Sequence, residues 1–77
     1  MFRANPLMVD AGYAPASQVA SVIKKAASTV HRMVETGRVE GARDGRALYV
    51  KVESLVAYYE ECGNEAMAQA VREALCG

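Results

Sequence analysis

The chain of 77 residues has room for one small domain, and its nine basic and nine acidic side chains give a formal net charge of zero. Because 52% of its residues are apolar, the composition argues against an intrinsically disordered protein. No apolar run approaches the roughly 20 residues of a membrane span, and the N-terminal residues lack the basic-then-apolar pattern of a secretory signal. We therefore expect a cytoplasmic protein.

The first segment, residues 1–14, predicts an irregular arm because Asn-Pro and Ala-Gly steps interrupt it. The arm is too apolar for a free tail, so we expect part of it to pack on the core. Its apolar side chains are Phe2, Leu7, Met8, Val9 and Tyr13.

Two short amphipathic helices are predicted next, with about three residues between them. The first covers Ser17 to Ile23, and Pro15 suits its first turn because proline has no N–H to leave unpaired. The second covers Ala27 to Thr36, and Gly37 supplies the left-handed residue that commonly closes a helix.

The second helix separates apolar from polar side chains. Val30, Met33 and Val34 share one face at spacings of three and four. The opposite face carries Ser28, His31, Arg32 and Glu35. Two short helices, a tight turn and a polar outer face on the second helix are typical of a helix-turn-helix, whose second helix reads DNA.

A β-hairpin is predicted after this helix. Residues 38–42 and 47–50 resemble strands, and Asp44-Gly45 between them is a two-residue turn signal. The implied register pairs Val39 with Val50, Gly41 with Leu48, and Arg43 with Arg46 at the tip. Facing like charges are destabilising unless an anion lies beside them, so the register favours a tip that contacts DNA phosphate. The alternative is an ordinary solvated turn.

Two further helices complete the chain. Val52 to Glu61 places Leu55, Tyr58, Tyr59 and Cys62 on one stripe, which indicates core and rim residues. Gly63 ends that helix and Asn64 caps the next, which covers Glu65 to Leu75. The last helix has an apolar face, which we expect to pack on its own domain through Met67 and Val71 or, alternatively, to form a contact between protomers.

The charges are separated along the chain. Residues 24–51 hold seven basic and three acidic side chains, a net charge of +4, whereas residues 52–77 hold one basic and five acidic side chains, a net charge of −4. This separation favours one face for phosphate and another that is solvated or meets a partner.

The segment from Gln18 to Tyr59 resembles the excisionase-like branch of the MerR-type winged-helix DNA-binding domains. The matching runs are Val19-Ala20-Ser21-Val22-Ile23, Thr29-Val30-His31-Arg32, Gly37-Arg38-Val39, Arg43-Asp44-Gly45-Arg46 and Ser54-Leu55-Val56-Ala57-Tyr58-Tyr59. Met33 takes the place of the usual Trp. In the turn, Lys24 replaces the usual Gly, Lys25 an apolar residue, and Ala26 a capping Ser or Thr, which costs about 1 kcal/mol.

The resemblance implies a mainly α fold with a small β-hairpin, namely a winged helix-turn-helix with an added C-terminal helix. It divides the chain into an arm (1–14), the DNA-binding domain (15–62) and the C-terminal helix (63–77). The candidate DNA contacts are Lys24, Lys25, Ala27, Ser28, Thr29, His31, Arg32, Arg38, Arg43 and Arg46. Arg32 is the candidate for a bidentate contact to guanine, with a phosphate contact or a salt bridge to Glu35 as alternatives.

No catalytic arrangement is evident, because His31 has no nucleophile at a suggestive spacing. One His and two Cys do not form a metal-ligand pattern, and no phosphate-binding glycine loop is present. We expect no enzyme activity, cofactor or small-molecule ligand.

The resemblance implies a double-stranded DNA-binding excisionase that bends attachment-site DNA, associates with copies of itself on DNA and has an integrase as partner. The alternatives are a small phage or plasmid transcriptional regulator and a protein-interaction module with weak DNA binding.

Overall fold

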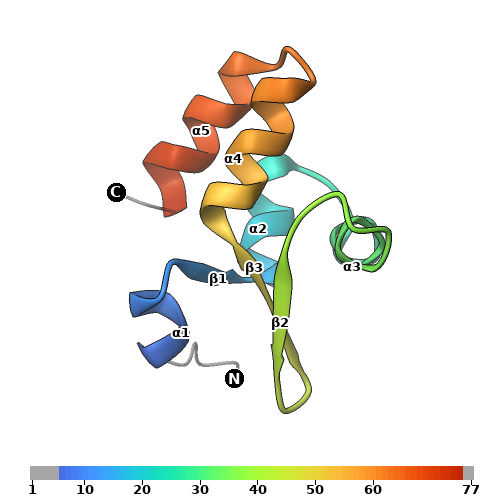
Figure 1. Ribbon diagram of the computed structural model, residues 1–77, viewed down its shortest axis with the longest axis vertical. Coiled ribbons are helices and arrows are strands. Elements are labelled where there is room, and N and C mark those ends of the chain that lie inside the picture. Colours follow the sequence, from blue (N-terminus) through green and yellow to red (C-terminus); the bar gives the residue numbers. More distant parts are fainter. Residues whose placement is uncertain (1–5, 76–77) are drawn as a thin grey trace.

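The computed structural model describes residues 6–75, which form five helices and a three-stranded antiparallel sheet (Figure 1). The mainly helical fold class with a small β-hairpin is confirmed, and a third strand extends the sheet in the order β1-β3-β2. The elements are α1 (Pro6–Asp10), β1 (Tyr13–Pro15), α2 (Ala16–Ile23), α3 (Ala27–Glu35), β2 (Gly41–Asp44), β3 (Ala47–Lys51), α4 (Val52–Glu61) and α5 (Glu65–Leu75).

The prediction of an irregular arm is wrong for α1 and β1. Strand β1 pairs with β3, and Pro15 ends it at the edge of the sheet, where its missing N–H removes no ladder hydrogen bond. Pro15 is also the N-cap of α2 and not part of its first turn. Ala14 is buried in the core, as expected for part of this segment, but Leu7 and Val9 are exposed. Phe2 lies outside the described residues.

Helices α2 and α3 have nearly the predicted bounds. Lys24, the C-cap of α2, adopts the left-handed conformation with φ of 58°. Two residues after the end of α3, Gly37 has φ of 77° and closes that helix in a Schellman motif. In that motif the N–H of Gly37 donates to the carbonyl of Val34 and the N–H of Arg38 to the carbonyl of Met33. The two helices are therefore closed by left-handed residues, one a lysine and one a glycine.

The hairpin register differs from the prediction by one turn position. Asp44 pairs with Ala47, so the turn residues are Gly45 and Arg46 instead of Asp44 and Gly45. Gly45 has φ of 64°, as the first central residue of a type II′ turn requires. The predicted pairs of Val39 with Val50, Gly41 with Leu48 and Arg43 with Arg46 are therefore wrong. Arg43 pairs with Leu48, and Gly41 pairs with Val50.

Helices α4 and α5 have the predicted bounds, but Cys62 is exposed and does not continue the buried stripe of Leu55. The backbone N–H of Met67 donates to Oδ1 of Asn64 over 3.1 Å, so Asn64 caps α5 as expected. Ala68 and Val71 are buried, and α5 packs against α4 and α2. This apolar face therefore packs on its own domain. Within residues 6–75, no helix is long and apolar enough to cross a membrane.

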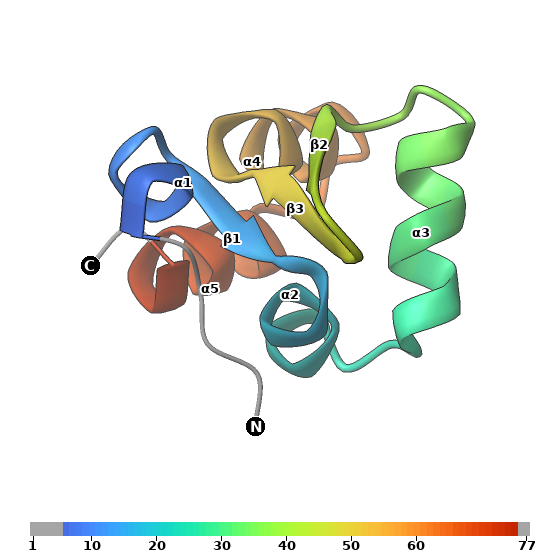
Figure 2. The same ribbon diagram turned by 90° about the horizontal axis from the view of Figure 1, so that it is seen from below.

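The core lies between α2, α4, α5 and one face of the sheet, and α3 closes one side of it (Figures 1 and 2). Its members from α2 to β3 include Val19, Ile23, Val30, Leu48 and Val50. Burying apolar side chains is the dominant stabilising term, at roughly 25 cal/mol per Å². Since Val30 and Met33 are the only buried residues of α3, that helix leaves most of its surface exposed.

Candidate nucleic-acid interface

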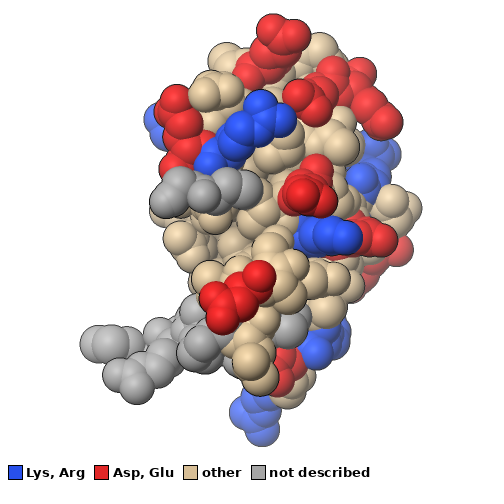
Figure 3. All heavy atoms as spheres, turned by 60° about the vertical axis from the view of Figure 1, so that its left-hand side comes forward, with Lys and Arg blue, Asp and Glu red and all other residues tan. Residues whose placement is uncertain are grey.

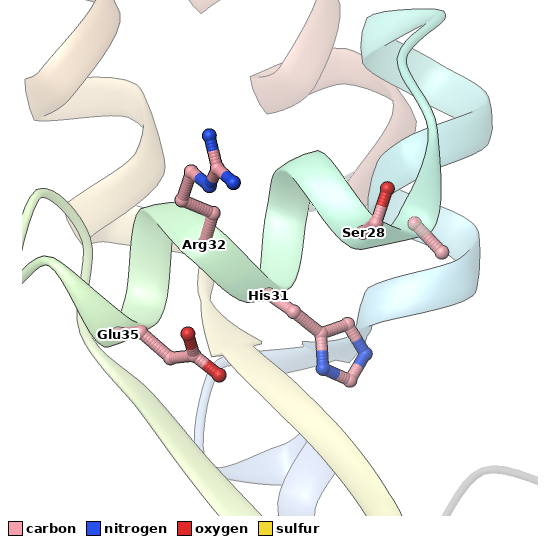
Figure 4. Close-up of a pocket in the computed structure, with 5 residues that line it drawn as sticks. Ser28, His31, Arg32 and Glu35 are labelled. Atoms are coloured by element: carbon pink, nitrogen blue, oxygen red, sulfur yellow. The ribbon is translucent and has the colours of Figure 1, made fainter.

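The outer face of α3 is a polar surface with an apolar anchor behind it. Val30 and Met33 are buried, and on the opposite side Ser28, Thr29 and Arg32 are exposed while His31 is half-buried. Figure 4 shows Ser28 and Arg32 pointing to one edge of this face and His31 and Glu35 to the other. The face is hollowed by a shallow depression lined by Ala27, Ser28, His31, Arg32 and Glu35.

The two ends of α3 are held differently. At its C-terminal end, the hydroxyl of Thr36 donates to the carbonyls of Arg32 and Met33, over 2.9 and 3.3 Å. At its N-terminal end, Ala26 makes no side-chain capping bond, as its residue type predicts. The first N–H groups of the helix therefore carry no capping side chain and face a solvent-exposed end.

A close approach fixes α3 against the hairpin. A Cβ at Gly41 would lie 2.8 Å from Cγ1 of Val34 and 3.0 Å from the carbonyl oxygen of Tyr49. Only a glycine allows strand β2 to lie this near to α3. At the base of the hairpin, the N–H of Glu40 donates to Oγ of Ser54 over 2.7 Å, and Lys51 Nζ lies 3.6 Å from Glu40 Oε2. The hairpin is thus held by α3 through the packing of Gly41 on Val34, and by α4 through the hydrogen bond to Ser54.

Six basic side chains of the candidate set are exposed, and none of them makes an ion pair within the part of the chain that the structure describes. They are Lys24, Lys25, Arg32, Arg38, Arg43 and Arg46. They come from the α2–α3 turn, from α3, from the loop after it and from the hairpin. The predicted salt bridge between Arg32 and Glu35, one of the alternatives for Arg32, is not formed. These guanidinium and ammonium groups are free to meet an external anion.

A second, narrower groove runs between α2, α3 and the hairpin. Its lining residues are Pro15, Ala16, Ser17, Ala27, His31, Arg46, Ala47 and Leu48. The structure thus brings together His31 and Arg46, two predicted site residues that are 15 positions apart. Ser17 was not predicted as a site residue. Periodicity placed it on the first helix, but only the position of the hairpin shows that it lines a groove.

The opposite end of the molecule is acidic. Figure 3, in which α5 comes forward, shows acidic side chains gathered at the upper end, over the turn between α4 and α5. Glu53, Glu60, Glu61, Glu65 and Glu73 are exposed. One of them, Glu60, lies 3.5 Å from Arg72 Nη2.

The surroundings of Tyr59 on α4 change the acidity of its phenol. Burial raises the pKa of the Tyr59 phenol above its ordinary value of 10.0, with smaller contributions from Tyr58 and Cys62. A raised phenol pKa opposes formation of a phenolate base.

Among residues 6–75, no charged side chain is buried, and no group of three or more His, Cys, Asp or Glu side chains is arranged to hold a metal ion.

Comparisons of this chain with models of protein families, with curated proteins and with solved structures found no match. The site is therefore interpreted from its own geometry.

Proposed function

We propose that this protein is a non-catalytic double-stranded DNA-binding protein of the winged helix-turn-helix type, acting in the cytoplasm. The observation that carries the proposal is the set of six exposed basic side chains without ion pairs around the polar face of α3. Phosphate groups of DNA are the natural partners of such a surface, because Lys and Arg contacts release condensed counterions.

The proposed division of work follows the elements. Helix α3 enters the major groove, where Ser28, Thr29 and Arg32 reach base edges. Lys24 and Lys25 contact the backbone beside it from the α2–α3 turn. Arg43 and Arg46 reach phosphate or the minor groove from the hairpin, which acts as the wing. The observed register supports this role without a like-charge pair, because Arg43 lies in β2 opposite Leu48 whereas Arg46 lies in the turn, and both are exposed.

Within this class, the resemblance of the sequence to excisionases favours a protein that bends attachment-site DNA and has an integrase as partner. A small transcriptional regulator with the same DNA-binding surface is the alternative. A protein-interaction module remains a second candidate because the exposed glutamates of α4 and α5 form an acidic surface away from α3.

The test is a salt titration of binding to a labelled random-sequence duplex, followed by fluorescence anisotropy between 50 and 200 mM salt. If Lys24, Lys25, Arg38, Arg43 and Arg46 contact phosphate while Arg32 reads a base, the slope of log K against log salt is about −4.5. Replacing Arg43 and Arg46 together by Gln should reduce the slope by about two units. Arg72→Gln is the matched control, because Arg72 is an exposed arginine on the acidic side and should leave the slope unchanged.

Absence of salt-dependent binding would contradict the proposal and favour the interaction module. An equal loss for the Arg72 control would show that only total charge matters. Base reading has its own test, since Arg32→Ala should weaken binding to a duplex selected from a random library by about 1–3 kcal/mol more than binding to unselected DNA. Equal losses on both duplexes would make Arg32 a phosphate contact.

A further inference from the structure

The groove between α2, α3 and the hairpin has the chemistry of an anion site. Its charged or titratable lining residues are Arg46, from the hairpin turn, and the half-buried His31, from α3. Ser17 of α2 adds a hydroxyl donor. The groove is lined by no carboxylate, so an anion that enters it meets donors and positive charge from three elements.

The first turns of two helices also line this groove, through Ala16 and Ser17 of α2 and through Ala27 of α3. Neither helix has a side-chain cap, because the N-cap residues are Pro15 and Ala26. The N–H groups of a first turn have no intrahelical acceptor, and they carry the positive end of the helix dipole. These two helix starts add to the Arg46 and His31 side chains in favouring a negatively charged ligand.

The charged and polar groups around His31 come from three elements. The hairpin contributes Arg46, and α2 contributes only the uncharged Ser17. On α3 itself, Glu35 points to the same edge as His31, whereas Arg32 points to the other edge (Figure 4). An anion bound between Arg46 and His31 interacts more favourably with the protonated imidazole than with the neutral one. Binding of such an anion is therefore coupled to proton uptake by the imidazole.

We propose that this groove binds one phosphate group of the DNA backbone between His31 and Arg46, and that His31 is protonated in the complex. The inference rests on the proposed DNA-binding function and adds a regulator to it, namely pH. Because the bound state holds one more proton than the free state, the affinity for DNA rises as the pH falls. The only covalent change is the N–H bond that the imidazole forms with a proton taken from solvent.

The first test measures the dissociation constant for a random-sequence duplex between pH 5.5 and 8, at constant ionic strength and without phosphate buffer. The native protein should bind about three- to tenfold more tightly at pH 6 than at pH 8, as uptake of up to one proton requires. His31→Gln should bind with nearly the same affinity across this range. Lys25→Gln is the matched control, since it removes a different phosphate contact and should weaken binding equally at every pH.

The second test needs no variant, because His31 is the only histidine of the chain. Its imidazole signals in an NMR spectrum report directly on this one side chain. The midpoint of its pH titration should move upward when a saturating duplex is added. Inorganic phosphate at the same ionic strength is the second probe, and it should move the midpoint less than the duplex does.

The outcomes separate this inference from the proposed function. Salt-dependent binding together with an unchanged His31 midpoint would overturn the phosphate site and leave DNA binding intact. A full upward shift with inorganic phosphate and none with the duplex would identify a site for free phosphate and overturn the assignment to DNA. Failure to bind any duplex would overturn both proposals together.

Discussion

The substitution Gly41→Ala, which adds one methyl group, tests how closely α3 packs against the hairpin. In Gly41→Ala, the added Cβ would lie 2.8 Å from Cγ1 of Val34, whereas carbon atoms pack at about 3.5–4.0 Å. Its other neighbour, the carbonyl oxygen of Tyr49 at 3.0 Å, belongs to the central strand of the sheet and is fixed by pairing on both sides. The Val34 side chain must therefore retreat by roughly 0.7 Å or more, either by leaving its present rotamer or by a movement of α3 away from the hairpin.

Overpacking of this kind typically destabilises a domain by about 1–3 kcal/mol. At about 4–8 °C per kcal/mol for a domain of this size, Gly41→Ala should lower Tm by about 5–20 °C in a thermal melt followed by circular dichroism. Val34→Ala removes both Cγ atoms that meet the new methyl group, so Gly41→Ala should cost at least about 1 kcal/mol less in that background.

The sign of the result is informative, because replacing an unstrained glycine by alanine otherwise stabilises a protein by about 0.4–1 kcal/mol. A Gly41→Ala variant as stable as the native protein would refute the close packing of α3 on the hairpin. An equal loss with and without Val34 would place the clash on the backbone of β3 alone.

Three further substitutions test other parts of the fold by urea or thermal unfolding. Lys24→Gly should stabilise the protein by about 1 kcal/mol, because a left-handed φ is costly for a residue with a Cβ, and a lower Tm would contradict the observed turn. Val71→Ala should destabilise it by about 1.5–3 kcal/mol because Val71 is fully buried, whereas a loss below 0.5 kcal/mol would contradict the packing of α5 on the core. The raised pKa of Tyr59 means that the unfolded chain loses this proton first, so stability should fall as the pH rises above about 10, and Tyr59→Phe should reduce that fall. An unchanged pH profile in Tyr59→Phe would exclude this contribution.

The helices were predictable because their signals are local. The apolar spacing of Val30 and Met33, the glycine at position 37 and the cap at Asn64 each act within one or two turns of helix. Strand β1 was missed because three residues are too few for a periodic pattern, and its partner β3 lies 34 or more positions further along the chain. The residues around β1 therefore contain no pattern that indicates its pairing with β3.

The hairpin register shows a second limit. Gly45 fits a two-residue turn either as its second residue, after Asp44, or as its first, before Arg46. The sequence around the turn does not distinguish these options, whereas the pairing of β3 with both neighbouring strands fixes the second. Individual basic side chains of the candidate site were predictable from their exposure on turns and on the outer face of α3. The groove that joins His31 to Arg46 was not, because it depends on where the hairpin lies against α2.

DNA is proposed to bind to the α3 face and the hairpin. The most direct measurement is a map of backbone amide shifts by two-dimensional NMR of the labelled protein as a random-sequence duplex is added at low salt. The shifts should concentrate in residues 24–38 and 43–46 and spare α4 and α5. Two results would contradict this proposal: shifts confined to the exposed glutamates of α4 and α5, or no shifts at all. The second result counts at a duplex concentration of about 1 mM, because that concentration saturates even ordinary non-specific binding.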